Sequence, residues 1–307
     1  MNQWTPEGMA EVGGGVELCF QERGDSDASP VVLVMGIGSQ MVNWPDGFCE
    51  LLAERGLRVI RFDNRDCGRS TWLTEAGVPS VTDAWQKRLA DPPYLLADMA
   101  GDVVGLLDAL ELEAAHVVGD SLGGFIAQTM AIERPERMLS LTSISSSTGE
   151  GSVGYPTEAA MRALMTRPAS DREGFVNGLV AARRVIGSPG FEMDEQLVRD
   201  TAARAWERGV NPDGTQRQLV ASICSGNRTE SLRGIELPTL VMHGADDPLI
   251  HVSGGRATAA AIPGARLVEI EGWGHDLPPA LWAGLTREIA DHVATAERAR
   301  EATPGLP

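Results

Sequence analysis

The chain has 307 residues, 43% of them hydrophobic, and a formal net charge of −17 at pH 7. This length allows one α/β domain with an insertion or two small domains. The acidic balance argues against nucleic acid or anionic membrane as a partner, because both carry negative charge. The start of the chain lacks a signal-peptide pattern, no apolar run approaches a membrane span, and the four cysteines lack metal or redox spacing. We therefore expect a cytoplasmic protein with reduced thiols.

Short apolar segments rich in β-branched residues indicate strands, and apolar residues at helical spacing indicate helices. In chain order, the predicted strands are residues 16–20 as an edge strand, 31–35, 58–62, 115–118, 139–144, 239–242 and 266–270. The predicted helices between and after them are residues 48–55, 96–110, 124–132, a segment that begins near 253, and 280–296, followed by a frayed tail. This alternation predicts an α/β fold with a mostly parallel sheet and helices on both faces.

The alternation of strands and helices breaks in the middle of the chain. No clear apolar strand occurs there, and four helix-like segments follow one another at 157–166, 171–185, 194–207 and 214–223. We therefore predict a core domain of residues 1–147 and 233–307, with a helical cap of residues 148–232 inserted between two strands. Ligands of open α/β sheets bind at the carboxyl ends of the strands, and the cap is expected to lie above that edge.

The segment Gly119-Asp120-Ser121-Leu122-Gly123 is the most informative motif of the chain. An apolar strand precedes it and a helix pattern follows it, which is the context of a nucleophile elbow. The glycines allow a tight turn and close packing of the helix on the strand. A serine at such a turn is exposed and faces the first N–H groups of the helix, so Ser121 is the candidate nucleophile.

A nucleophilic serine needs a base, and His275 is the best candidate among five histidines. It lies in the loop Gly272-Trp273-Gly274-His275, directly after the last predicted strand, from which it can reach back over the sheet. The others occupy a predicted core strand, a strand end, a loop and a helix surface: His116, His243, His251 and His292, respectively. Of these four histidines, only His243, at the strand end, is a further and weaker candidate for the base.

Two aspartates follow the strand between the serine and the histidine, in Gly244-Ala245-Asp246-Asp247-Pro248. One can cap the turn while the other orients the imidazole. We favour Asp247 as the orienting acid and keep Asp246 as the alternative. For the oxyanion hole we expect the backbone N–H groups of Leu122 and of Ile37, which lies in the glycine-rich loop after residues 31–35.

Together these motifs resemble the α/β-hydrolase superfamily over nearly the whole chain, with the order serine, acid, histidine. Asp63-Asn64-Arg65-Asp66-Cys67-Gly68-Arg69-Ser70 resembles a D-x-R-x-x-G-x-S segment that is mainly architectural in that family. Asn43-Trp44-Pro45-Asp46 and Gly274-His275-Asp276-Leu277-Pro278 are most similar to aclacinomycin methylesterase and related esterases. The resemblance implies a carboxylic-ester hydrolase with a helical cap. The expected substrate is a small-molecule ester, and methyl esters are one candidate class. The resemblance implies no metal and no organic cofactor.

The chain departs from that pattern at two positions. Asp120 stands where many relatives have a small residue, and Met35 stands where a histidine precedes the first glycine of the oxyanion loop. A buried carboxylate beside the serine opposes formation of an oxyanion nearby if it points inward.

Several alternatives stay open. The same triad serves cofactor-free haloperoxidases and perhydrolases and carbon–carbon bond (diketone) hydrolases, and a non-catalytic small-ligand binder is a third class. Four apolar cap residues are candidates for a pocket wall, although their helical spacing favours packed core: Met161, Met165, Val176 and Trp206. The sequence predicts neither the physiological ester nor the oligomeric state.

Overall fold

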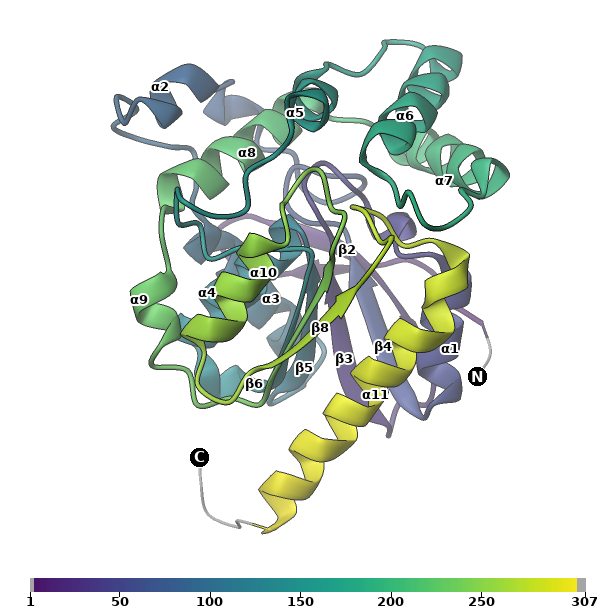
Figure 1. The fold of residues 1–307 in the computed structure, drawn as a ribbon, viewed down its shortest axis with the longest axis vertical. Coiled ribbons are helices and arrows are strands. Elements are labelled where there is room, and N and C mark those ends of the chain that lie inside the picture. Colours follow the sequence, from purple (N-terminus) through teal and green to yellow (C-terminus); the bar gives the residue numbers. More distant parts are fainter. Residues whose placement is uncertain (1–2, 303–307) are drawn as a thin grey trace.

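The computed structural model describes residues 3–302, and an eight-stranded sheet lies at its centre (Figure 1). The strand order is β1-β2-β4-β3-β5-β6-β7-β8; β1 and β2 pair antiparallel, as do β2 and β4, and all other pairs are parallel. The strands are β1 (Gly8–Glu11), β2 (Glu17–Arg23), β3 (Ser29–Val34), β4 (Leu57–Phe62), β5 (Ala115–Asp120), β6 (Met138–Ile144), β7 (Thr239–Gly244) and β8 (Arg266–Ile270). The predicted fold class, a mostly parallel α/β sheet, is confirmed.

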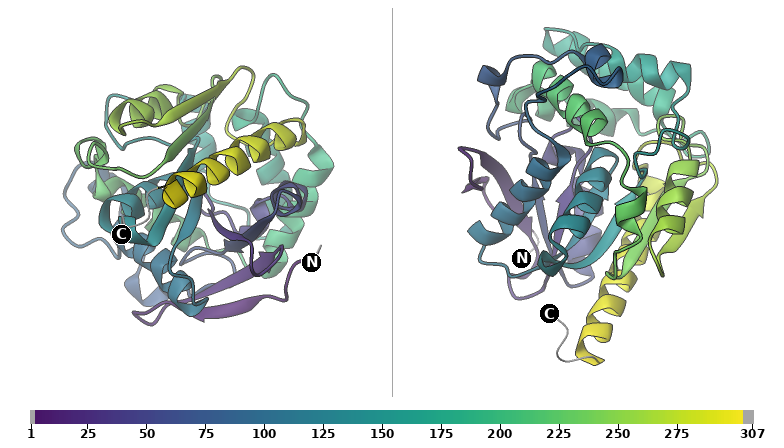
Figure 2. Two further views of the ribbon diagram at one scale, coloured as in Figure 1. Left: turned by 90° about the horizontal axis from the view of Figure 1, so that it is seen from below. Right: turned by 90° about the vertical axis from the view of Figure 1, so that its left-hand side faces the viewer.

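Helices cover both faces of the sheet (Figure 1, Figure 2). One face packs against α1 (Asp46–Glu54) and α11 (Pro279–Ala302), and the other against α3 (Leu96–Ala109), α4 (Leu122–Glu133), α9 (Thr229–Leu232) and α10 (Ser253–Ala261). The burial of β3 on both faces explains why its sequence is continuously apolar. Val32 and Val34 point into the core beside α3 and α4, whereas Val31 and Leu33 point into the core beside α1 and α11. A strand buried on both faces needs no polar alternation.

A helical insert lies between β6 and β7 and above the carboxyl ends of the parallel strands (Figure 1). It consists of α5 (Glu158–Met165), α6 (Arg172–Ile186), α7 (Glu195–Arg208) and α8 (Pro212–Ser225). Two buried ion pairs tie it to the core. Arg208 of α7 pairs with Asp63, and Arg217 of α8 donates to both carboxylate oxygens of Asp66 at 2.6 and 2.7 Å. Among residues 3–302, no helix is both long and apolar enough to cross a membrane.

Three expectations about the elements were wrong. Residues 16–20 do not form the edge strand, because β1 pairs outside β2. Strand β1 has four residues and only one buried side chain, so its pattern is too short to stand out. Helix α11 continues to Ala302 instead of fraying after Ala296. His292 is buried, with 8% of its surface exposed, and its Nε2 donates to the Leu141 carbonyl at 3.2 Å.

The crossing of β5, α4 and β3 depends on two glycines. A Cβ atom added at Gly119 would lie 2.1 Å from the carbonyl oxygen of Gly123, and one added at Gly123 would lie 2.0 Å from that of Val34. Both distances are far below van der Waals contact, and the obstacles are backbone atoms that no rotamer change can remove. Helix α4 can therefore approach the two strands only because neither position has a side chain.

We expect Gly119→Ala to lower the free energy of unfolding by about 3 kcal/mol or more, because the new methyl group overlaps the backbone of α4. The control is Gly101→Ala, at an exposed position of helix α3, where an added Cβ meets no atom within 4 Å. That change should raise stability by about 0.5–1 kcal/mol. Urea unfolding measures both. Equal midpoints for the two variants would contradict the proposed packing constraint.

Candidate active site

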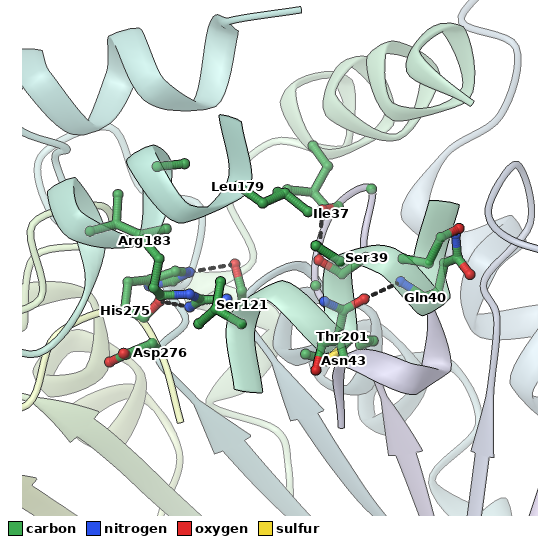
Figure 3. Close-up of a pocket in the computed structure, with 18 of the residues that line it drawn as sticks. Ile37, Ser39, Gln40, Asn43, Ser121, Leu179, Arg183, Thr201, His275 and Asp276 are labelled. Carbon is green, nitrogen blue, oxygen red and sulfur yellow. Dashed lines mark hydrogen bonds between the residues drawn. The ribbon is translucent and has the colours of Figure 1, made fainter. Parts of the chain in front are cut away.

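Ser121, Asp247 and His275 meet at the carboxyl edge of the sheet. Ser121 connects β5 to α4, Asp247 follows β7 and His275 follows β8. The His275 Nε2 lies 3.1 Å from the Ser121 Oγ, and its Nδ1 lies 2.7 Å from the Asp247 Oδ2. Figure 3 shows the contact between Ser121 and His275 at the floor of a cavity. The three residues predicted from the sequence thus lie in the order and at the distances that a hydrogen-bonded triad requires.

The backbone of Ser121 has an unusual conformation, with φ 55° and ψ −116°. Non-glycine residues rarely adopt a positive φ, and such strain costs about 1–3 kcal/mol where the surroundings enforce it. Two contacts hold the turn. The Ser121 N–H donates to the Ile144 carbonyl at 2.9 Å, and the Ser146 hydroxyl donates to the Ser121 carbonyl at 3.0 Å. The turn lifts the side chain away from the strand, as in a nucleophile elbow.

Asp247 is held as an acceptor for the imidazole. Its Oδ1 accepts the N–H groups of Leu249 and Ile250 at 2.8 and 2.9 Å, which leaves Oδ2 for His275. Burial favours the neutral acid, but the charge and hydrogen bond of His275, together with the nearby His243, outweigh it and hold the pKa of Asp247 well below its ordinary value. Asp246 instead accepts the Gly272 N–H at 2.7 Å, so it caps the turn.

The ionised Asp247 determines the tautomer of His275. A carboxylate only accepts, so the proton lies on Nδ1, and Nε2 is free to accept from the Ser121 hydroxyl. Burial alone lowers the pKa of His275, but the charge and hydrogen bond of Asp247 outweigh burial and raise it above its ordinary value. Helix α6 positions the backbone of His275 through two hydrogen bonds. The His275 N–H donates to the Ile186 carbonyl at 2.7 Å, and the Arg183 side chain donates to the His275 carbonyl at 3.0 Å.

The weaker candidate, His243, lies beside the carboxylate of Asp247, and none of its hydrogen bonds within residues 3–302 reaches Ser121. Its Nε2 donates to the Ile250 carbonyl at 2.7 Å and lies 3.6 Å from the Asp247 Oδ2. This places the ring behind the turn that carries Asp247. The contact geometry therefore favours a positioning role for His243 in holding that turn.

The loop of residues 36–40 after β3 lies directly against the serine. A Cβ atom added at Gly36 would be 3.2 Å from the Ser121 Cβ and 3.7 Å from its Oγ. Among the hydrogen bonds within residues 3–302, none has the N–H of Ile37 or Leu122 as its donor. Both of the donors predicted for an oxyanion hole are thus available to a ligand.

Asp120 lines the same cavity beside Ser121. Burial raises the pKa of its carboxyl to about 6, although the charges of His275 and Arg183 lower it. The carboxyl therefore lies within electrostatic range of His275, and its charge opposes an oxyanion nearby when it is ionised. At neutral pH its negative charge also favours the protonated form of His275.

The cavity has a volume of about 320 Å³, a size that suits a small molecule. Helix α6 lines it with one face, on which residues recur at helical spacing: Phe175, Leu179, Ala182, Arg183 and Ile186. Polar groups of Gln40, Asn43 and Thr201 lie at the opposite side (Figure 3).

The four apolar cap residues suggested by the sequence are not among the described residues that line the cavity. Val176 and Trp206 pack in a cluster that joins the cap to Cys19, Met41 and Val42 of the core, and Met165 is exposed. The periodicity of α6 identifies its apolar face. However, it cannot distinguish a face that borders a cavity from one that packs against a neighbouring helix.

Comparisons with known proteins agree with this fold. The family model described as the alpha/beta hydrolase fold matches residues 29–278. The chain is 33% identical over 302 residues to rhodomycin D methylesterase of a Streptomyces species, covering 92% of this chain and 96% of the relative. It is 31% identical over 302 residues to rhodomycin D methylesterase of Streptomyces peucetius, with the same coverage.

A solved hydrolase structure from Pseudomonas aeruginosa superposes with a TM-score of 0.67 at 26% identity, covering 94% of this chain and 97% of that one. The family model and the two relatives each span most of the chain, including the predicted elbow and the last strand. This protein therefore belongs to the α/β-hydrolase family and is related to methylesterases.

Proposed function

We propose that this protein is a serine esterase that hydrolyses a small-molecule carboxylic ester, with methyl esters as the first class to test. The hydrogen-bonded row of Ser121, His275 and Asp247, at 3.1 and 2.7 Å, is the observation that carries the proposal. Its position under a cavity with two unbonded N–H groups supports acyl transfer rather than simple binding.

In the first half of the reaction, the Ser121 Oγ attacks the ester carbonyl while its proton moves to the His275 Nε2. The N–H groups of Ile37 and Leu122 stabilise the negative oxygen that forms. The bond between the carbonyl carbon and the alcohol oxygen then breaks, and His275 returns the proton to the leaving alcohol. An acyl group remains on Ser121.

In the second half, His275 takes a proton from water and the resulting hydroxide attacks the acyl-enzyme. The bond to the Ser121 Oγ breaks, the proton returns to that oxygen, and the carboxylic acid leaves. Asp247 stays ionised throughout and stabilises the imidazolium. No step needs a metal ion or an organic cofactor.

The names of the two relatives support a methyl ester as the substrate, with methanol as the leaving group. Methanol is small, so nearly all of the cavity is available to the acyl part. The apolar face of α6 favours a largely apolar acyl group with polar substituents toward Asn43 and Thr201.

We also propose a cytoplasmic location and a division into a core of residues 1–147 and 233–307 and a cap of residues 148–232. The position of the insert between β6 and β7 supports the division. Four free cysteines support a reducing compartment: Cys19, Cys49, Cys67 and Cys224.

The role of Ser121 is tested by stopped-flow hydrolysis of p-nitrophenyl acetate and butyrate. We expect a rapid burst of one nitrophenol per wild-type active site, and no burst with Ser121→Ala, whose kcat should fall by about 10⁴-fold or more. Turnover of a panel of methyl and aryl esters then identifies the preferred leaving group. Equal activity in Ser121→Ala would rule out the scheme. A wild type with no burst and no turnover would favour a carbon–carbon bond hydrolase or a non-catalytic binder.

The role of His275 predicts a pH dependence. His275 must be neutral to accept a proton, and its pKa is raised, so kcat/KM should fall with decreasing pH at an apparent pKa above about 6.5. Asp247→Asn removes the charge that outweighs burial. The acidic limb should therefore move to lower pH, and kcat should drop by about 10⁴-fold.

Two controls separate the contributions to that pH profile. Asp246→Asn removes a negative charge from the same turn but keeps an oxygen that can accept the Gly272 N–H, so it should keep both the limb and kcat. Because the carboxyl of Asp120 has a pKa of about 6, the comparison is repeated in an Asp120→Asn background, where the remaining limb belongs to His275. An acidic limb that stays in place in Asp247→Asn would show that Asp247 does not control the base.

A further inference from the structure

The loop of residues 36–40, called the oxyanion loop here, is fixed at its two ends by the core. The Asn64 side chain donates to the Met35 carbonyl at 2.9 Å, and the Met41 N–H donates to the Asp63 carboxylate at 2.7 Å. Within the loop, the Ser39 N–H donates to the Gly36 carbonyl at 3.2 Å. These contacts leave the middle of the loop, around Ile37 and Gly38, to be held by something else.

Helix α8 of the cap supplies that contact through Gln218. The Gln218 Oε1 accepts the Gly38 N–H at 2.8 Å, and its Nε2 donates to the Arg65 carbonyl in the loop after β4, also at 2.8 Å. The side chain has 0% of its surface exposed. Gln218 therefore joins the cap, the oxyanion loop and the core with one buried amide.

Helix α8 also limits the shape of the loop at Gly38. This residue has φ +62°, and a Cβ atom added to it would lie 2.7 Å from the Thr215 Oγ1. Only glycine combines this backbone conformation with so close an approach to the helix. The same property makes the peptide between Ile37 and Gly38 easy to rotate when no partner holds its N–H.

Helix α7 holds the other end of the oxyanion loop through Gln40. The Gln40 Nε2 donates to the carbonyls of Ala205 and Gly209 at 2.8 and 2.7 Å, and its Oε1 accepts from the Arg208 Nε at 2.9 Å. Two buried glutamines, one in the loop and one in the cap, thus join the loop to both α7 and α8. The cap contacts the backbone of the loop directly, in addition to covering the cavity.

We propose that Gln218 is a positioning residue that holds the oxyanion loop, so that the cap takes part in forming the oxyanion hole. This inference rests on the proposed function. The N–H of Ile37 belongs to the peptide next to the one that Gln218 holds. If the acceptor is lost, the Gly38 N–H has no partner among residues 3–302, and because Gly38 is exposed beside the cavity, its peptide can rotate to bond water there. That rotation displaces the Ile37 N–H from the developing oxyanion.

The test is Gln218→Met, which keeps the length and apolar volume of the side chain and removes both hydrogen bonds. Loss of one oxyanion donor costs about 10²–10³ in kcat, so a misplaced donor should lower kcat by about 10- to 100-fold. KM should change by less than about threefold, because the acyl part of the cavity is intact. These constants are measured with the best p-nitrophenyl or methyl ester.

The matched control is Gln128→Met, in helix α4. Gln128 also has 0% of its surface exposed, and it bonds Ser143 at 3.2 Å and Arg228 at 3.4 Å, away from the oxyanion loop. This variant loses similar buried hydrogen bonds and should keep the wild-type kcat. A comparable fall of kcat in both variants would show a general effect of stability and overturn the positioning role.

Two inhibitors provide a readout that a merely structural role would not change. A trifluoromethyl ketone adds to Ser121 and forms an oxyanion, so its Ki should rise in Gln218→Met by the same factor as kcat/KM falls. The amide of the same acyl group forms no oxyanion, so its Kd should stay unchanged. An unchanged Ki for the ketone would contradict the proposal.

Ester hydrolysis by the wild type is measured first, and the absence of both a burst and steady turnover overturns the proposed function and this inference together. If the wild type hydrolyses the ester, a kcat of Gln218→Met within twofold of the control overturns this inference alone. If Gln218→Met does not fold, Gln218→Asn replaces it. That side chain is one methylene too short to span Gly38 and Arg65, so we expect the same selective fall in kcat, and a wild-type kcat overturns the inference.

Discussion

The backbone of Ser121, forced to φ 55° between β5 and α4, is the constraint on which the site depends. A serine in ordinary strand geometry would point out of one face of the sheet and be covered by a helix. The turn is possible because Gly119 and Gly123 let backbone approach backbone, and because Ile144 and Ser146 bond the serine's own peptide groups. The strain of the turn is offset by the packing of two cores against the sheet.

Parallel pairing gathers the other groups at the same place. Strands β3, β5, β7 and β8 run in one direction, so the loops that follow them carry Ile37, Ser121, Asp247 and His275 to one edge. Ser121 and His275 are 154 positions apart in the sequence, yet their side chains are in hydrogen-bond contact. The cap completes this arrangement, since α6 bonds the backbone of His275 and α8 bonds that of Gly38.

The sequence was sufficient where a local pattern carries the information. Continuous apolar runs predict the buried strands, and a serine between glycines at a strand–helix boundary predicts the elbow. Short elements could not be predicted from the sequence. Strand β1 and helix α9 have four residues each, too few for a periodicity to appear. Contacts between segments far apart in the sequence could not be predicted either. Nothing near Gln218 in the sequence indicates that it bonds Gly38, which lies 180 positions away.

The same reasoning explains the aspartate pair and the cap. The sequence placed Asp246 and Asp247 in one turn and favoured the second, but only the fold shows that Asp246 faces Gly272 while Asp247 faces the imidazole. In the cap, periodicity identifies apolar faces without saying what they contact. The face of α6 that carries Leu179 borders the cavity, whereas the neighbouring Val176 packs against Trp206 and its cluster.

The most direct measurement is labelling with a fluorophosphonate, followed by mass spectrometry of the peptides. This reagent attaches to a serine only when a base and an oxyanion hole activate it. We expect a single adduct on the peptide that contains Ser121, lost in Ser121→Ala and strongly slowed in His275→Ala. Continued ester hydrolysis with no adduct, or an adduct on another residue, would contradict the assignment of Ser121 as the nucleophile.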